Sequence, residues 1–338
     1  MNYKIFFSFL FIGAVVLFSG CSSKQVFKPV QKTLGDWKYE DDLNESIIDV
    51  TANGALLEDG SVLYKDKVIT DLNISTENDR LIGISDGWVI TAQIDGNVTL
   101  TKENNGSVKE NIDLKKTVAA ASVQGDTLAV VFASDDMALY SLSSKKILFH
   151  IEGNPPIVVD TRIVNPYFLD DLVLFSTLDG RIVIVNAKDK KVLRSIIVSS
   201  SEHFNNITAF DVVGNNLVAA SGYKLLSLTD KERREPYEIR NMKYDKDGIF
   251  IATKQGEIVN LTQGLQVKAK AKFPFAHFLG MILTDDRVYV LEKEGYLISL
   301  KKDLSSYELY DVDIDDDSYI YVGDKAFYVD DEYFPIKK

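Results

Sequence analysis

The chain has 338 residues, with 38 Lys and Arg against 50 Asp and Glu, so its formal net charge at pH 7 is −12. This acidic balance argues against binding to nucleic acid, whose affinity depends on Lys and Arg contacts to phosphate. It also argues against a role on the surface of an anionic membrane. A single cysteine excludes an internal disulfide.

The first 20 residues are typical of a bacterial lipoprotein signal peptide. Lys4 supplies a positive charge, and the apolar run at residues 5–18 is too short to span a membrane comfortably. Ser19 and Gly20 then precede Cys21. Small residues before a cysteine resemble the lipobox, at which the cysteine becomes lipidated and forms the new N-terminus. We therefore predict that Cys21 carries lipid chains such as palmitate; the alternative is a plain signal peptide.

The residues after the cysteine predict the membrane and the domain boundary. Ser22 follows Cys21, whereas an Asp directly after the cysteine would resemble an inner-membrane retention signal. We therefore expect a lipid-anchored protein of the outer membrane that faces the periplasm. Residues 21–35 are polar and basic, which predicts a flexible tether, and no later break in composition divides residues 36–338. We expect these to form one domain.

Four asparagines in the first third of the chain share the pattern acidic-x-Asn-x-Ser/Thr. They are Asn44, Asn73, Asn97 and Asn105. The pattern resembles the extended acceptor sequence of bacterial periplasmic N-glycosylation, a longer form of Asn-x-Ser/Thr. The alternative is that turn segments are rich in these residue types in any case. These four residues are candidate glycosylation sites.

One short pattern repeats eight times between residues 60 and 331: a β-rich run, a tight acidic or glycine turn, and a second β-rich run. The eight turns lie at Asp59-Gly60, Asp95-Gly96, Asp135-Asp136, Asp179-Gly180, Ser221-Gly222, Gln255-Gly256, Glu294-Gly295 and Asp330-Asp331. Successive turns are 34 to 44 residues apart. A period near 40 with several strands per repeat is typical of a β-propeller.

The run before each turn is almost wholly apolar, as in Leu128 to Phe132 and Val288 to Leu291. Short apolar runs rich in Val, Ile, Tyr and Phe predict strands that are buried on both faces. A third strand follows most hairpins after a polar turn. We therefore predict an all-β, eight-bladed propeller; a seven-bladed one, with a weak repeat miscounted, is the alternative.

The final hairpin, Lys325 to Ile336, has no strand after it, because the chain stops. Spare strand-like residues stand before the first hairpin, at Asp36 to Glu40 and at Ser46 to Val50. If the first of these pairs with the last blade, the ring closes and no sheet edge is left open at the junction. We therefore expect both termini to meet in one blade.

The clearest repeat carries a resemblance to a known family. Asp171 to Ile197 reads as an apolar strand, Asp-Gly, a second apolar strand that ends in Asn, a polar turn, and then Lys-Val-Leu. This pattern resembles the quinoprotein-like (PQQ-like) repeat and the BamB family, lipid-anchored propellers that assist the outer-membrane β-barrel assembly machinery. The resemblance implies an eight-bladed scaffold that docks a periplasmic domain of the barrel-inserting subunit.

In that family, a loop before a central apolar strand carries an Arg followed by a Pro. Here Thr161 to Pro166 precedes the strand at 172–177 and matches this layout, so the resemblance implies a partner contact at Arg162. The family's next loop is acidic, whereas this chain has Phe204 to Thr208 there. The plain alternative for Arg162 is an ordinary surface arginine.

We find no catalytic motif, and we expect no cofactor and no metal. There is no Gly-x-Ser-x-Gly, His-Glu-x-x-His or phosphate-binding glycine-rich loop. His150, His203 and His277 are far apart in the sequence. The acidic run from Asp311 to Asp317 lacks the glycine and glutamate that an EF-hand loop needs, and its Val/Ile alternation predicts a strand with aspartates facing water.

These observations predict a non-enzymatic outer-membrane scaffold that docks a protein, with the barrel-inserting subunit as the expected partner. An envelope-binding or adhesion propeller with no role in barrel assembly is the first alternative. A small-ligand sensor or enzyme that uses the central channel is the second, and ionisable side chains that converge at the channel would favour it.

Overall fold

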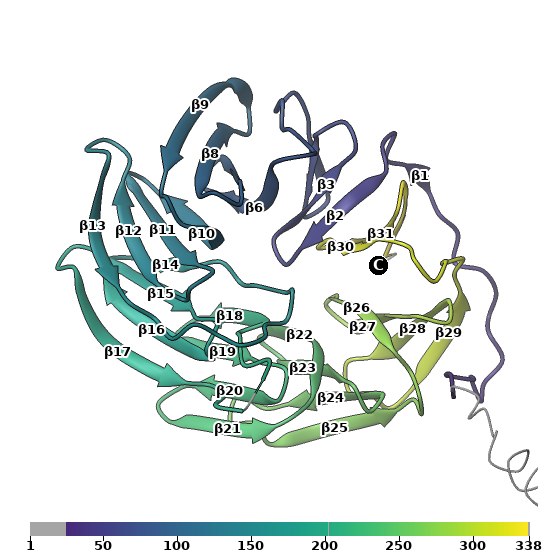
Figure 1. Ribbon diagram of the computed structural model, residues 1–338. Coiled ribbons are helices and arrows are strands. Elements are labelled where there is room, and N and C mark those ends of the chain that lie inside the picture. The colour runs from purple at the N-terminus through teal and green to yellow at the C-terminus, as the bar shows by residue number, and fades with distance from the viewer. Residues whose placement is uncertain (1–24, 202, 337–338) are drawn as a thin grey trace, which may run out of the picture.

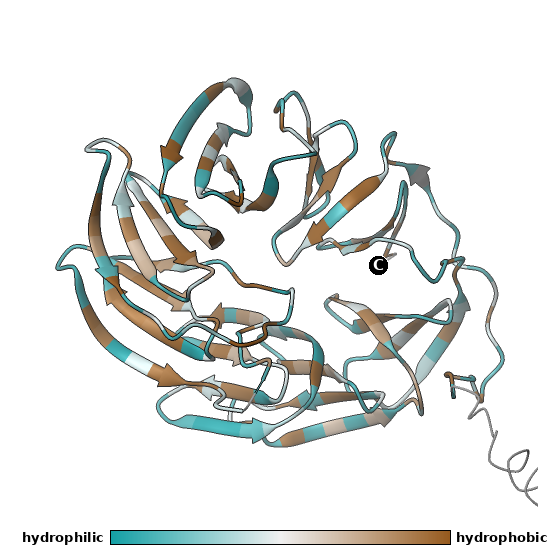
Figure 2. Ribbon diagram, in the orientation of Figure 1, coloured by the Kyte–Doolittle hydropathy of each residue, from teal (hydrophilic) through white to brown (hydrophobic). Residues whose placement is uncertain are grey.

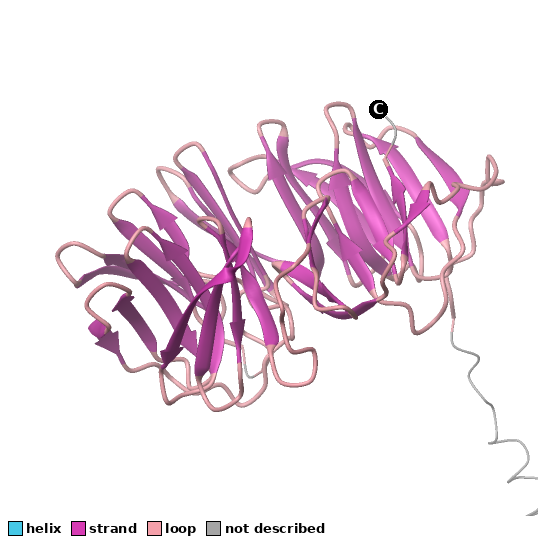
Figure 3. Ribbon diagram, turned by 90° about the horizontal axis from the view of Figure 1, so that it is seen from above, coloured by secondary structure: helices cyan, strands magenta, loops and turns pink. Residues whose placement is uncertain are grey.

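The computed structural model describes residues 25–201 and 203–336, and in these residues it contains strands, turns and loops but no helix. The strands form eight antiparallel sheets of four strands each, which stand around a central channel as the blades of a propeller (Figures 1 and 3). The predicted eight-bladed fold is confirmed, and the seven-bladed alternative is wrong.

Within blades 1 to 7 the strands follow chain order from the channel outwards. Blade 1 contains β2 (Ile47–Thr51), β3 (Gly54–Leu57), β4 (Val62–Tyr64) and β5 (Lys67–Ile69). Blade 2 contains β6 (Arg80–Ser85), β7 (Trp88–Ala92), β8 (Asn97–Lys102) and β9 (Asn105–Asp113). Blade 3 contains β10 (Val118–Gln124), β11 (Thr127–Phe132), β12 (Met137–Ser141) and β13 (Lys146–Ile151). Blade 4 contains β14 (Tyr167–Leu169), β15 (Leu172–Ser176), β16 (Arg181–Asn186) and β17 (Lys191–Ile197).

The second half of the ring repeats this arrangement. Blade 5 contains β18 (Ala209–Val213), β19 (Asn216–Ala220), β20 (Lys224–Leu228) and β21 (Glu232–Pro236). Blade 6 contains β22 (Ile239–Asp245), β23 (Gly248–Thr253), β24 (Glu257–Leu261) and β25 (Val267–Lys272). Blade 7 contains β26 (Phe278–Leu283), β27 (Arg287–Glu292), β28 (Tyr296–Lys301) and β29 (Tyr307–Asp311). Blade 8 contains β30 (Ile320–Val322), β31 (Ala326–Val329), β32 (Glu332–Pro335) and the N-terminal β1 (Asp41–Asp42).

Burial within a blade explains the apolar runs of the sequence. The second strand of each blade is the most buried, and every residue of β23 is buried because neighbouring blades cover both of its faces. The outermost strands face solvent; β21 is the clearest polar one and is hydrophilic along most of its length (Figure 2). The core therefore lies between blades rather than at one centre.

All eight predicted turns join the second and third strands of a blade. In most of them a glycine lies against the chain that leaves the outermost strand of the same blade. The Gly256 carbonyl oxygen, for example, accepts a hydrogen bond of 2.7 Å from the Phe273 N–H. A Cβ atom on Gly256 would lie 2.1 Å from the Phe273 oxygen, and Gly256 has a φ of +75°, so both space and conformation require glycine.

The two ends of the described chain meet in blade 8, as predicted. The strand that closes the ring is β1, in which Asp41 and Asp42 pair with Tyr333 and Glu332. The prediction that Asp36 to Glu40 supplies this strand was therefore a few residues too early.

The residues just before β1 contact both blade 7 and blade 8. The Trp37 N–H bonds the Asp311 oxygen at 2.8 Å, and the indole ring packs on Tyr310 with 4.8 Å between ring centroids. The indole N–H also donates to the Pro335 oxygen at 3.2 Å, and the Glu40 N–H donates to the Tyr333 oxygen at 3.0 Å. The segment is therefore bonded to both blades before the strand pairing begins at Asp41.

The segment expected to act as a tether also contacts the propeller where it is described. Phe27 is 5% exposed and packs against Phe273 and Tyr296 between blades 6 and 7. The Leu34 N–H donates a 2.8 Å hydrogen bond to the Leu309 oxygen. Cys21 and the signal sequence lie outside the described residues.

The acidic run after Asp311 is a loop, not the strand that the alternation predicted. Val312 is buried and Ile314 packs on the core beside blade 8, so the alternation records two anchor points of the connection between blades 7 and 8. No helix in residues 25–201 and 203–336 is long and apolar enough to cross a membrane.

Candidate functional site

The connection from blade 3 to blade 4, residues 152–166, enters the central channel. Asn165 fixes its end, because its Oδ1 accepts the Ala121 N–H at 3.2 Å and its Nδ2 donates to the Ile82 oxygen at 3.0 Å. From the opposite side, the Nδ2 of Asn53 donates to the Ile163 oxygen at 3.3 Å. We call residues 152–166 the crossing segment, since these bonds tie it to blades 1, 2 and 3.

Arg162 lies on the crossing segment inside the channel rather than on an outer loop. Its Nε and one terminal nitrogen donate to the two oxygens of Asp160, and its other terminal nitrogen donates to the Arg240 carbonyl oxygen on β22. Burial alone would raise the pKa of Asp160, but these Arg162 contacts hold it below the ordinary value. The Arg162 side chain is 36% exposed, so part of it still reaches solvent.

The two loops compared in the sequence, at 161–166 and 204–208, lie side by side. The buried Asn206 joins them, because its Nδ2 donates to the Asp160 and Arg162 oxygens and its Oδ1 accepts the Asp160 N–H at 2.7 Å. The Phe204 N–H bonds the Val158 oxygen at 3.3 Å. Arg162 is therefore braced by the next connection, whatever partner it meets.

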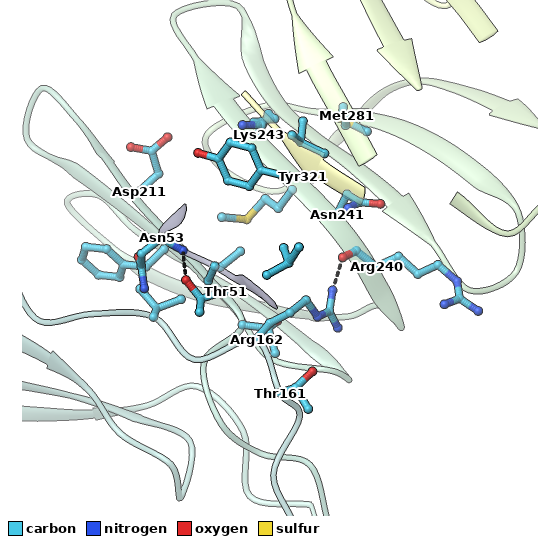
Figure 4. A pocket seen from close by; sticks show the side chains of 18 of the residues that line it. Thr51, Asn53, Thr161, Arg162, Asp211, Arg240, Asn241, Lys243, Met281 and Tyr321 are labelled. Carbon is cyan, nitrogen blue, oxygen red and sulfur yellow. Dashed lines mark hydrogen bonds between the residues drawn. The ribbon is translucent and has the colours of Figure 1, made fainter. Parts of the chain in front are cut away.

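The crossing segment leaves a cavity of about 390 Å³ in the other half of the channel (Figure 4). Inner strands of blades 1, 5, 6, 7 and 8 line it, with the crossing segment as its remaining wall. Its side chains include Thr51, Asn53, Arg162, Val164, Phe210, Asp211, Asn241, Lys243, Met281 and Tyr321. This size is within the range of small-molecule sites, about 300–1,000 Å³.

Two unpaired charges of opposite sign face this cavity from neighbouring inner strands. Lys243 on β22 makes no hydrogen bond or ion pair with the described residues. Burial lowers the pKa of its ammonium, against the raising effect of Asp324, Asp211 and Asp66. Asp211 on β18 accepts only the Val212 N–H at 2.8 Å, and burial raises the pKa of its carboxyl.

A second feature is the end of the propeller that carries the eight turns and the connections between blades, which we call the hairpin face. Antiparallel order within each blade puts both kinds of loop at the same end. Large apolar side chains are exposed there: Ile94 (86%), Ile157 (82%), Phe275 (58%), Tyr319 (47%) and Phe204 (40%). Phe204 and Phe275 also have φ values of +54° and +68°, which is uncommon for bulky residues.

The other residues singled out in the sequence do not gather at one site. Asn44, Asn73, Asn97 and Asn105 are all exposed, and Asn73 and Asn105 line one hollow between the outer parts of blades 1 and 2. The three histidines lie on β13 and on two separate connections, after blades 4 and 6. Among the described residues, no group of three or more His, Cys, Asp and Glu is arranged to hold a metal ion.

Sequence reasoning missed Lys243, Asp211 and Tyr321. The available signal was a charged residue inside the first strand of a repeat, in Asn-Met-Lys-Tyr and in Ala-Phe-Asp-Val. First strands line the channel, so a charge there points either into the channel or between blades, and the sequence does not say which.

The fold and these surfaces define an eight-bladed β-propeller with a partly filled channel and an apolar loop face. No protein-family model matches the chain. In sequence it is similar to plasminogen-binding protein PgbB from two strains of Helicobacter pylori, with 30% identity over 88% of this chain. The chain spans 63% and 62% of the length of those two proteins, less than two thirds.

Solved structures of different proteins share this fold. BamB from Moraxella catarrhalis superposes with a TM-score of 0.67 and 14% identity, covering 88% of this chain and 99% of that one. The C-terminal WD40 domain of Sif2 gives the same TM-score with 13% identity, covering 91% of this chain and 100% of that one. At such low identity these likenesses show the fold and leave the activity open.

Proposed function

We propose that this chain is a non-catalytic, protein-binding propeller that is held on the outer membrane by lipid on Cys21 and offers its hairpin face to a protein partner. The observation that carries the proposal is the set of exposed apolar side chains on that face, led by Ile157 and Phe275. Exposed aromatic and aliphatic groups on one surface favour protein binding. The left-handed backbone of Phe275 supports this, because strained residues persist mainly where they have a use.

The first candidate partner is an extracellular protein such as plasminogen. The name of the similar Helicobacter pylori protein, plasminogen-binding protein PgbB, supports this candidate, and the 30% identity runs through 88% of the present chain. This is a likeness in sequence, whereas the likeness to BamB at 14% identity is one of fold alone. The chain covers 63% of the length of that relative, so we propose plasminogen binding for this chain as a hypothesis to be tested.

The test measures plasminogen binding to the full-length, detergent-solubilised protein by surface plasmon resonance. Ile157→Asp and Phe275→Asp place a charge in the contact and should each weaken binding at least about tenfold, as for central interface residues. Leu193→Asp is the matched control, because Leu193 is 56% exposed but lies on the outer strand β17. If all three variants bind equally well, the hairpin face is not the binding surface.

The second candidate partner is the barrel-inserting subunit of the assembly machinery. The specific observation in its favour is that the loops at 161–166 and 204–208 lie side by side, as the BamB resemblance requires of its two contact loops. Arg162 would then be a partner contact, since arginine bonds carboxylates bidentately. Its bonds to Asp160 and the Arg240 carbonyl oxygen would have to be shared or exchanged on docking.

Crosslinking in native membranes tests this candidate, with wild type and Arg162→Ala compared. Loss of an anchor contact should cost about 2 kcal/mol, or roughly thirtyfold in affinity. Because Arg162 also braces the crossing segment, thermal unfolding is measured on the same samples. Failure of the barrel-inserting subunit to crosslink with wild type contradicts this candidate, and equal crosslinking by a folded Arg162→Ala contradicts only the site.

The two candidates require opposite sides of the outer membrane. Barrel assembly needs the periplasmic face, which the signal sequence predicts, whereas capture of an extracellular protein needs the cell surface. Antibody labelling of intact and permeabilised cells separates them. The anchor itself is tested by labelling with a fatty-acid analogue: Cys21→Ser should lose the label, and equal labelling of both proteins would rule the anchor out.

Asn44, Asn73, Asn97 and Asn105 are proposed glycan acceptors in a host that has the bacterial pathway. All four are exposed, which an acceptor asparagine must be. Intact-mass spectrometry of the native protein should show glycan masses beyond the lipid. A mass explained by lipid alone contradicts the proposal.

A further inference from the structure

The channel cavity is lined by a lysine and an aspartate that form no ion pair with each other. Lys243 has no hydrogen-bond or ion-pair partner among the described residues, and Asp211 has no side-chain partner. Figure 4 shows both at one side of the cavity, with the Tyr321 ring between them. A charge that is taken out of water without a partner is costly, so such a pair calls for a compensating group.

The surrounding carboxylates are already engaged or lie in solvent. Asp66 accepts the Lys325 N–H at 3.2 Å and the Tyr328 hydroxyl at 3.5 Å, and Asp324 is exposed. These two therefore stabilise the Lys243 ammonium from a distance without closing an ion pair. Asp211 is the carboxylate among these three that lines the cavity.

Tyr321 adds a hydrogen-bond donor at the same place. Its oxygen accepts the Lys65 N–H at 2.8 Å, which leaves the hydroxyl hydrogen free to donate. The rest of the wall near these groups includes apolar side chains, among them Val164, Phe210 and Met281. A ligand can therefore meet a cation, an anion, a donor and an apolar wall in one cavity of about 390 Å³.

We propose that this cavity binds a small zwitterion, a molecule with one carboxylate and one ammonium such as a free amino acid with an apolar side chain. The carboxylate bonds Lys243 and the Tyr321 hydroxyl, the ammonium bonds Asp211, and the apolar part lies against Met281 and Phe210. A simple anion would satisfy Lys243 but meet the repulsion of Asp211, Asp66 and Asp324. A simple cation would satisfy Asp211 and be repelled by Lys243.

The crossing segment supplies one wall of this site. Arg162 and Thr161 form part of the cavity wall, and the Arg162 bond to the Arg240 carbonyl oxygen holds that wall against β22. The three groups that would contact the ligand, Lys243, Asp211 and Tyr321, lie on inner strands of blades 6, 5 and 8. Ligand binding can therefore be measured without a protein partner, and the two proposals succeed or fail separately.

Isothermal titration calorimetry on the full-length, detergent-solubilised protein tests the inference with leucine, valine and methionine as probes. At least one should bind. Its deamino acid and its decarboxylated amine, which keep the apolar group and lose one charge each, should bind at least about tenfold more weakly. Absence of binding by all three amino acids up to about 10 mM would overturn the site, and equal binding of an analogue would overturn the zwitterion class.

Two variants locate the site. Lys243→Met and Asp211→Asn should each weaken binding of the same amino acid at least about tenfold. Lys246→Met and Asp285→Asn are the matched controls, because both residues are exposed, and both should bind as wild type does. Circular dichroism and thermal unfolding verify that each variant is folded, with Lys243→Gln as a replacement if Lys243→Met is not. Unchanged binding by the folded Lys243 and Asp211 variants would overturn the assignment.

Discussion

Blades 3 and 6 make the same contact between their hairpin and the connection that leaves them, but they put the glycine on opposite sides of it. In blade 6 the glycine is in the hairpin, where a Cβ on Gly256 would lie 2.1 Å from the Phe273 oxygen. In blade 3 the hairpin is Asp135-Asp136, and the glycine is in the connection, where a Cβ on Gly153 would lie 1.9 Å from the Asp135 oxygen.

This difference shows that the contact needs one residue without a Cβ, and that the chain can supply it from either side. Blade 3 therefore keeps the propeller geometry although its hairpin lacks the glycine of the repeat. It gains a side-chain bond in exchange, since the Asp136 carboxylate accepts the Gly153 N–H at 3.2 Å. Gly153 is itself part of the crossing segment, whereas blade 6 goes directly to blade 7 through residues 273–277.

The largest expected effect comes from filling the contact in blade 6. Gly256→Ala adds both a clash with the Phe273 oxygen and an alanine at a φ of +75°. We expect the free energy of unfolding to fall by about 3–4 kcal/mol, because strain and overpacking add. Denaturant unfolding measures it.

Gly125→Ala is the control for that substitution. Gly125 also has a positive φ, +56°, but a Cβ there meets no atom within 4 Å. Its cost should be the conformational part alone, about 1 kcal/mol. Equal losses for the two variants would mean that the close approach in blade 6 has no energetic weight.

In blade 3 the corresponding loss of stability should come from a substitution in the connection. Gly153→Ala brings a methyl group against the Asp135 oxygen without a positive φ, so we expect a smaller loss of about 2–3 kcal/mol in the same unfolding experiment. If Gly153→Ala is as stable as wild type, the exchange of glycine between the two sides is not the reason why blade 3 keeps its geometry.

The sequence predicted the local part of this arrangement and not the long-range part. Turn pairs such as Asp179-Gly180 are visible because Asp and Gly act within a few residues, and their period gave the blade number. The partner of Asp135 at Gly153 lies in a connection with no repeat pattern. The bond from Arg162 to the Arg240 carbonyl oxygen joins residues 78 positions apart, so a loop that reads as surface lies in the channel.

The crossing segment, which contains Gly153, depends on such long-range bonds, and Asn165 makes two of them. Asn165→Ala removes the acceptor for the Ala121 N–H and the donor to the Ile82 oxygen. The Ile82 oxygen keeps a 3.4 Å bond from the Asn53 Nδ2, so the Ala121 N–H is the group left unpaired. Its loss of a partner should cost about 1–2 kcal/mol in the free energy of unfolding. Asn154→Ala, on the same segment but exposed and with a side chain bonded only to the Asp179 carboxylate, should cost less than about 0.5 kcal/mol. Similar losses would contradict a pinning role for Asn165.

The two blades also differ in how their contribution to stability depends on pH, because the blade 6 hairpin has no carboxylate in its turn pair. Burial raises the pKa of Asp135 to about 7, whereas the Lys116 ammonium holds the pKa of Asp136 at about 2. With a raised pKa, the folded protein binds a proton at Asp135 that the unfolded chain has lost. Wild-type stability from this group is therefore full below its ordinary pKa of 3.8 and declines as the pH rises through 7.

Asp135→Asn removes this decline while keeping an oxygen that can accept the Leu178 N–H, which the carboxylate bonds at 2.6 Å. Thermal unfolding between pH 4 and 8 should find that the stability of the variant relative to wild type rises with pH, by about 1.4 kcal/mol for each unit by which burial has raised the pKa of Asp135. The loss of the carboxylate's second bond, to the Asp179 N–H, lowers the stability of the variant across the whole range, so the readout is the change of the difference with pH. A constant difference across this range would show that Asp135 is ionised in the folded protein throughout. The exchange of glycine for aspartate in blade 3 would then carry no pH-dependent cost.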